Sequence, residues 1–148
     1  MKILFDTDVV LDVLLDRPPF VEAALLLFNR AEQKAIQGYL CATTITNIYY
    51  IARPRVGKAV ALNRIRELLD IFEIALVNRS VLSMAVDGSF SDFEDGVLYE
   101  SARRVGAEFI VTRNASDFEK AEIPVYSPDD LNALIDLRDA EEVDTEGV

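Results

Sequence analysis

Short apolar runs that end in polar residues alternate along the chain with segments whose apolar residues recur at helical spacing. The run at residues 3–5 stops at Asp6, and the apolar residues of 9–15 that follow have the spacing of a helix. The same alternation continues through the chain. It predicts strands at 3–5, 39–43, 71–77, 108–112 and 123–126, and helices at 9–15, 21–36, 44–52, 58–69 and 81–86, with two more that begin near 91 and at 128.

Strands that alternate with helices predict a three-layer α/β/α domain with a mainly parallel central sheet, because parallel neighbours need helical crossovers. Pro54 disfavours helix in the preceding residue, so the helix from residue 44 is expected to stop by Arg53. Pro128 suits the first position of the last helix. We expect one domain over residues 1–136, and a flexible tail over the polar and acidic residues 137–148.

Polar residues at strand ends are the first candidates for a site, because ligands bind beyond the carboxyl ends of parallel strands. Asp6 either caps the first helix or serves a site, and we favour the site slightly. Asp8, Asp12 and Asp16 have i, i+4 and i+8 spacing, which is typical of a solvated helix face, so only Asp8 is kept as a candidate. Asp117 lies in a polar loop, where an Asx turn or a helix cap explains it equally well.

The helix expected near Ser91 carries an acid that packing does not explain. Ser91 and Glu94 have the spacing of a capping box, which gives Glu94 a structural role. With Ser91 as N-cap, Asp95 takes the fourth helical position, where Phe90 would need an apolar partner, and it shares the apolar face that should cover the sheet. A buried carboxylate is costly unless it is paired or binds a cation. Asp92 is more simply a solvated first-turn acid that could reach the same site.

The composition narrows the chemistry further. The chain has no histidine, which excludes Ser-His-Asp and Cys-His nucleophiles, HExxH zinc sites and an imidazole base. Converging carboxylates without histidine favour a hard cation, Mg²⁺ or Mn²⁺, which activates water and bridges an acidic site to a phosphate. The single cysteine, Cys41, permits no internal disulfide, so we expect a reducing, cytoplasmic location. No uncharged apolar stretch approaches the about 18 residues of a membrane span.

Three segments in combination resemble the PIN-domain family, which includes the VapC-like toxin endoribonucleases. They are FDTDVVLDVLLDR, SDFEDGVLYESARRVGAEFIVTRNASDF and IPVYSPDDL, within residues 2–134. The resemblance implies a Mg²⁺ or Mn²⁺ site for RNA hydrolysis in which Asp6, Asp95 and Asp117 are catalytic and hold the ion. Asn114 lies at a neighbouring position that is often acidic. The resemblance also implies a homodimer and a small antitoxin as partner.

The chain departs from the family pattern at two positions. The usual glutamate of an early helix falls on Asn47, a neutral side chain that can hold a water or a ligand of the ion but brings no charge. Asp8 stands where asparagine is common. We hypothesise that this extra acid compensates in part for Asn47, which an unchanged metal affinity in Asp8→Asn would contradict.

Basic residues offer candidate contacts to RNA in spite of an acidic chain. With 15 basic and 26 acidic residues the net charge is −11, which argues against strong nonspecific binding of nucleic acid. Residues 53–66 nonetheless carry basic side chains and no acid. The candidate RNA contacts are Arg53, Arg55, Lys58 and Arg113. A solvated helix face that pairs with the acidic tail explains the basic residues of 53–66 at least equally well.

Two alternatives stay open. Residues 6–10 fit the DxDx[TV] signature of haloacid-dehalogenase-like phosphohydrolases, with Asp6 as nucleophile and Asp8 as general acid. However, the final acidic pair of that family should follow an apolar strand and a catalytic lysine, and such an enzyme should be larger. Asn47 motivates the second alternative, a catalytically weak or silent PIN-like module that binds RNA or a protein.

Overall fold

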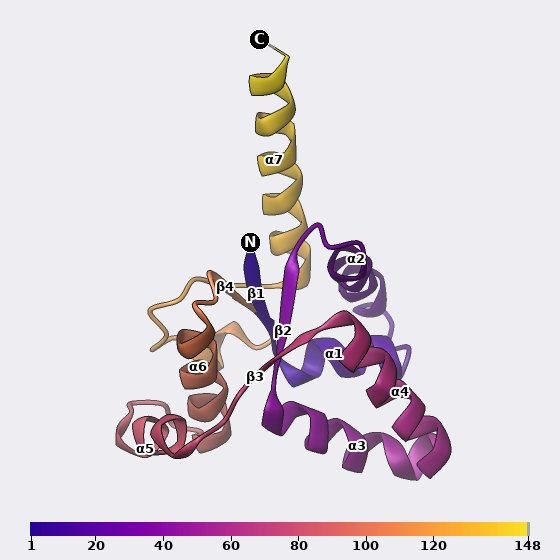
Figure 1. Cartoon of the computed structure of the whole chain (residues 1–148), viewed down its shortest axis with the longest axis vertical. Helices are drawn as coiled ribbons and strands as arrows, with labels where there is room; N and C mark the ends of the chain where they lie inside the picture. The colour runs from indigo at the N-terminus through magenta and orange to yellow at the C-terminus, as the bar shows by residue number, and fades with distance from the viewer. Residues whose placement is uncertain (148) are drawn as a thin grey trace.

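The computed structural model describes residues 1–147 and builds them around one sheet of five strands (Figure 1). In chain order the elements are β1 (Lys2–Phe5), α1 (Thr7–Leu14), α2 (Val21–Glu32), β2 (Gln37–Cys41), α3 (Ala42–Val56), α4 (Lys58–Ile71), β3 (Glu73–Ala75), α5 (Arg79–Asp87), α6 (Phe93–Val105), β4 (Phe109–Val111), the 3-10 helix η1 (Ala115–Phe118), β5 (Val125–Tyr126) and α7 (Pro128–Glu146). The strand order is β3-β2-β1-β4-β5, and all neighbouring pairs are parallel.

Successive side chains of the strands enter two apolar cores, one on each face of the sheet. In β1, Ile3 and Phe5 belong to one core and Leu4 to the other, which is the period of a strand buried on both faces. Buried residues of α1, α2, α3, α4 and α7 complete the first core, and those of α5, α6 and η1 complete the second. The expected three-layer α/β/α fold with a parallel central sheet is therefore confirmed.

Two predicted helix ends are wrong, and both errors have a local cause. The helix expected to stop before Pro54 continues to Val56, because Pro54 lies exposed in the last turn, where its missing N–H costs a single backbone hydrogen bond. The helix expected to reach residue 36 ends at Glu32, because Lys34 adopts a left-handed φ of 64° that helical geometry forbids.

The last helix extends through the region where a flexible tail was expected. Leu131 and Ile135 are buried, whereas residues 136–145 are exposed, and Figure 1 shows this part of α7 projecting away from the sheet. Residues 137–146 are thus helical in the structure rather than irregular, and residue 148 lies outside the described residues. The flexibility of the segment stays a prediction. No helix within residues 1–147 is long and apolar enough to cross a membrane.

Candidate active site

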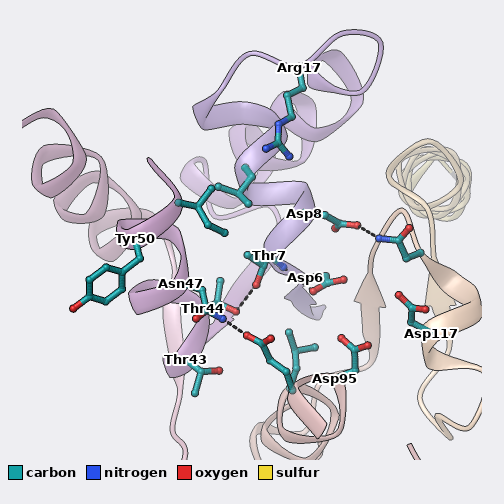
Figure 2. A pocket seen from close by; sticks show the side chains of 15 residues that line it. Asp6, Thr7, Asp8, Arg17, Thr43, Thr44, Asn47, Tyr50, Asp95 and Asp117 are labelled. Carbon is teal, nitrogen blue, oxygen red and sulfur yellow. Dashed lines mark hydrogen bonds between the residues drawn. The ribbon is translucent and has the colours of Figure 1, made fainter. Parts of the chain in front are cut away.

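A cleft with a volume of about 490 Å³ opens at the carboxyl ends of β1 and β2 (Figure 2). It lies where the strand order reverses, since the chain leaves β1 through β2 and β3 and returns to the other side of β1 for β4 and β5. Ligands bind at such reversals in parallel sheets. The cleft is lined by Asp6, Thr7, Asp8, Leu11, Arg17, Thr43, Thr44, Asn47, Tyr50, Ile51, Glu94, Asp95, Leu98, Asn114 and Asp117.

Asp6 combines the two roles considered for it, because it caps α1 and lines the cleft. Its Oδ1 accepts the backbone N–H of Thr7 at 2.7 Å, and its Oδ2 accepts the hydroxyl of Thr112 at 2.8 Å. Burial, the largest influence, raises the pKa of Asp6, and the charges of Asp117 and Glu94 raise it further, while the two hydrogen bonds oppose them. The carboxylate is therefore fixed in orientation and surrounded by other acids.

Asp8 lies beside Asp6 and leaves one oxygen without a partner. Its Oδ2 accepts the side-chain amide of Asn114 at 2.8 Å and the backbone N–H of Arg113 at 3.3 Å. Its Oδ1 is buried and has no hydrogen-bond partner among the described residues. Burial and the charge of Asp6 raise the pKa of Asp8 to about 6. Buried polar atoms are rarely left unsatisfied, so this oxygen is an exception within the described residues.

Asp95 enters the cleft from the first turn of α6, although the capping box predicted there is wrong. Asp92 is the N-cap instead of Ser91, because its side chain accepts the backbone N–H of Asp95 at 3.0 Å. Asp95 consequently takes the third helical position, and its half-buried side chain lines the cleft. Burial raises the pKa of Asp95 to about 7, with further contributions from Asp6, Asp92, Asp117 and Glu94 in that order. Asp92 itself does not line the cleft.

Asp117 reaches the cleft from η1, the short helix that follows β4. The buried Phe118 packs η1 against α6, and Asp117 is exposed on the side of the cleft. Its charge contributes to the raised pKa of both Asp6 and Asp95. Figure 2 shows Asp6, Asp8, Asp95 and Asp117 gathered on one side of the cleft. The predicted acids therefore converge, although they come from distant parts of the chain.

Sequence reasoning missed the role of Glu94 in this cleft. The capping box would have tied Glu94 to its own helix, but its Oε1 instead accepts a hydrogen bond from Nδ2 of Asn47 on α3. Both side chains line the cleft. The spacing of the acids in FSDFED fits a cap at Ser91 or at Asp92, so the sequence alone does not fix which face Glu94 occupies.

Asp12 and Arg113 also differ from their predicted environments. Asp12 was assigned to a solvated face, yet its residue is 0% exposed, and its carboxylate accepts two hydrogen bonds from the guanidinium of Arg113 at 2.6 and 3.1 Å. The guanidinium also lies 4.0 Å above the ring of Phe20. Arg113, a candidate RNA contact, is thus committed to an ion pair within the protein.

The other predicted RNA contacts lie outside the cleft. Arg53 and Arg55 are exposed at the end of α3, and Lys58 is exposed at the start of α4. Among the described residues that line the cleft, Arg17 is the only cation. Arg17 was not singled out from the sequence, because DRPPF offers no signal that its side chain returns to the cleft.

The donor chemistry of the cleft fits a hard cation. In the described part of the chain, no three His, Cys, Asp or Glu side chains are placed so that they hold a metal ion as they stand. The buried, unsatisfied Oδ1 of Asp8 and the all-oxygen donor set nevertheless match the preference of Mg²⁺ and Mn²⁺.

Comparison with known sequences matches a model of the PIN domain to residues 2–116 of this chain. The chain is also similar to Ribonuclease VapC1 of Aquifex aeolicus, with 32% identity over 90 residues. That alignment covers 57% of this chain and 56% of the relative, so it spans little more than half of either protein.

Solved structures share the fold at low sequence identity. FitAcB of Neisseria gonorrhoeae has a TM-score of 0.68 at 22% identity, over 85% of this chain and 97% of that chain. DNA-bound VapBC of Salmonella typhimurium has a TM-score of 0.67 at 15% identity, over 86% and 98%. The sarcin-ricin loop cleaving toxin VapC20 of Mycobacterium tuberculosis has a TM-score of 0.59 at 13% identity, over 73% and 86%.

Proposed function

Because the chain belongs to the PIN-domain family, we propose that it is a metal-dependent endoribonuclease with Asp6, Asp95 and Asp117 as its catalytic, ion-holding residues. The observation that supports this most is the convergence of these carboxylates, from β1, α6 and η1, on one cleft at the carboxyl edge of the sheet. The ribonuclease name of the Aquifex relative agrees with it. A bound Mg²⁺ or Mn²⁺ would act as a Lewis acid that activates water toward a phosphodiester.

The residues of the cleft have distinct parts in this proposal. Thr7 and Thr112 hold Asp6 in one orientation through its two carboxylate oxygens. Asn114 and the backbone of Arg113 hold Asp8, so that its free Oδ1 is the oxygen available to the ion. This arrangement extends the hypothesis that Asp8 compensates for the neutral Asn47, and metal affinity in Asp8→Asn tests it.

Arg17 supplies the positive charge that an acidic cleft needs in order to hold RNA. Its side chain is one-third exposed and lines the cleft, with Nη1 3.9 Å from Asp12. Since Asp12 already accepts two shorter hydrogen bonds from Arg113, the guanidinium of Arg17 is largely free to bind a phosphate. We propose Arg17 as a phosphate contact, with Arg53, Arg55 and Lys58 along a more distant part of the RNA.

We also propose that the chain forms a homodimer and is held by a small antitoxin. Its structural neighbours include a toxin-antitoxin complex of Klebsiella pneumoniae and VapBC of Rickettsia felis bound to a promoter fragment. Light scattering of the purified chain tests the dimer, because the mass is 16.5 kDa for one copy and twice that for two.

One alternative keeps a specific observation in its favour. Asn47 is neutral, and a catalytically weak or silent module that binds RNA or a protein would tolerate it. The haloacid-dehalogenase-like alternative, with Asp6 as nucleophile, is not supported, since the chain belongs to a different family.

Cleavage of a mixed RNA pool tests the proposal. Wild type is compared in EDTA, Mg²⁺ and Mn²⁺ with Asp95→Asn and with Asp130→Asn. Asp130 is a matched control, because it is exposed at the third position of α7 and its backbone N–H is capped by Ser127 as that of Asp95 is by Asp92. We expect metal-dependent cleavage that only Asp95→Asn abolishes. Wild type that binds RNA and cleaves none with either ion would favour the silent module instead.

A further inference from the structure

Two polar side chains of the cleft form a hydrogen bond between helices that are far apart in the sequence. Nδ2 of Asn47, on α3, donates a hydrogen bond to Oε1 of Glu94, in the first turn of α6. Figure 2 shows Asn47 across the cleft from Asp95. The hydrogen bond uses one oxygen of Glu94 and leaves Oε2 without a hydrogen bond from the described residues. Through this hydrogen bond, Asn47 holds a carboxylate of α6 on the α3 side of the cleft, where α3 itself has no acid.

We propose that Glu94 supplies a further carboxylate to the cation and that Asn47 is the positioning residue that orients it. The inference rests on the proposed function, since the cation is that of the nuclease. The proposal assigns Asn47 a role in the site. The amide of Asn47 on α3 and the carboxylate of Glu94 on α6 together replace a single acid on α3.

Charge balance supports this assignment. Glu94 lines the same cleft as Asp6 and Asp95, so its charge lies close to theirs. None of these three acids forms an ion pair with Lys or Arg in the described residues. An added acid in this place is unfavourable unless a cation offsets it.

Glu94 could also have a purely structural role at its helix N-terminus, and Glu22 is a control for that role. Acids in the first turn of a helix interact favourably with its dipole, and Glu94 occupies the second position of α6. Glu22 occupies the second position of α2, is exposed and does not line the cleft. Glu22→Gln therefore removes the same charge from the same helical position, away from the site.

Titration with Mn²⁺ followed by isothermal calorimetry at about pH 8, where carboxylates are ionised, tests the proposal. Four proteins are compared: wild type, Glu94→Gln, Glu22→Gln and the double variant Asn47→Glu/Glu94→Gln, which moves the acid to α3. Thermal unfolding in EDTA establishes that each is folded. We expect Glu94→Gln to weaken Mn²⁺ binding by about 10-fold or more, Glu22→Gln to leave it unchanged, and the double variant to regain most of the lost affinity.

Each other result has a defined meaning. Equal affinities of Glu94→Gln and Glu22→Gln would overturn the role of Glu94 while leaving the metal site in place. Loss in Glu94→Gln without recovery in the double variant would also overturn it, because a structural contact does not return when an acid is placed on α3. Wild type that binds no Mn²⁺ would instead overturn the proposed function itself.

Discussion

Asp8 and Asp12 lie one turn apart on α1, and their surroundings are opposite. Asp12 is fully buried, and the guanidinium of Arg113 donates two hydrogen bonds to it. Asp8 is held by an amide and a backbone N–H, leaves a buried oxygen unsatisfied and has another acid, Asp6, as its neighbour. Two identical residues at helical spacing thus differ in whether a guanidinium of the protein forms an ion pair with them.

The difference separates an acid that stabilises the fold from the acids that we propose as site residues. The pair of Asp12 and Arg113 ties α1 to the loop after β4 and is complete within the chain. In the cleft, burial and, after it, the like charges raise the pKa values of Asp8 and Asp95, which is a cost to stability. Sequences keep such locally unfavourable arrangements mainly where function needs them.

The largest expected effect comes from breaking the complete pair. Asp12→Asn leaves Arg113 without its counterion, and we expect it to lower the free energy of unfolding by about 3 kcal/mol, the lower end for a buried pair because Arg113 is partly exposed. Asp16→Asn is the control, since Asp16 is exposed and asparagine also tolerates its left-handed φ of 49°. Urea unfolding measures both. Equal stability of the two variants would show that the pair contributes nothing.

The same change in the cleft is expected to have the opposite sign. In EDTA at about pH 8, Asp95→Asn removes a charge that burial disfavours and that Asp6, Asp92 and Asp117 oppose. Because Asp95 is only half-buried, solvent screening reduces the gain, and we expect the melting temperature to rise by about 1–3 °C. Asp130→Asn should not raise it, since Asp130 is favourably placed at a helix N-terminus. A lower melting temperature in Asp95→Asn would contradict the unfavourable placement of Asp95.

The raised pKa values predict how stability depends on pH. The pKa of Asp95 is raised from 3.8 to about 7 and that of Asp8 to about 6, so the folded protein binds protons more tightly than the unfolded chain does. Stability from these groups is therefore present below the usual value, falls as the pH rises between about 4 and 7, and is constant above. Thermal unfolding in EDTA across this range should show a steeper fall for wild type than for Asp95→Asn. Parallel curves would contradict the shift at Asp95.

Much of this picture follows from the sequence, because it depends on periodicity and on chain topology. The apolar runs that end at Asp6 and Thr112 identify strands, and the parallel arrangement brings their ends to one edge of the sheet. The convergence of Asp6, Asp95 and Asp117 could be expected for that reason. All three side chains line the cleft, although the cap predicted at Ser91 is wrong.

The features that the sequence did not reveal depend on which partner a side chain finds across the fold. Asp12 has the spacing of a solvated stripe, and only the packing of the loop after β4 brings Arg113 to it. Glu94 fits a capping box one residue out of register, and the capping of α6 by Asp92 turns it toward Asn47. The local sequence pattern cannot distinguish a solvated acid from one that binds a partner on a distant element, because an acid at the same helical spacing is compatible with both environments.

The smallest expected effect concerns Arg17, which we propose as a phosphate contact. In the Asp95→Asn background, in which we expect no cleavage, we expect Arg17→Ala to weaken binding of labelled single-stranded RNA. It should also reduce the salt slope of log K by about 0.7, the value for one phosphate contact. Stability should change little, because Asp12 retains both hydrogen bonds from Arg113.

Arg79→Ala is the control, since Arg79 is exposed at the start of α5 and does not line the cleft. Fluorescence anisotropy at several salt concentrations measures both slopes. If Arg17→Ala instead destabilised the fold and left the slope unchanged, Arg17 would belong with Arg113 to the structural pair, and the cleft would depend on its metal ion alone to hold the phosphate.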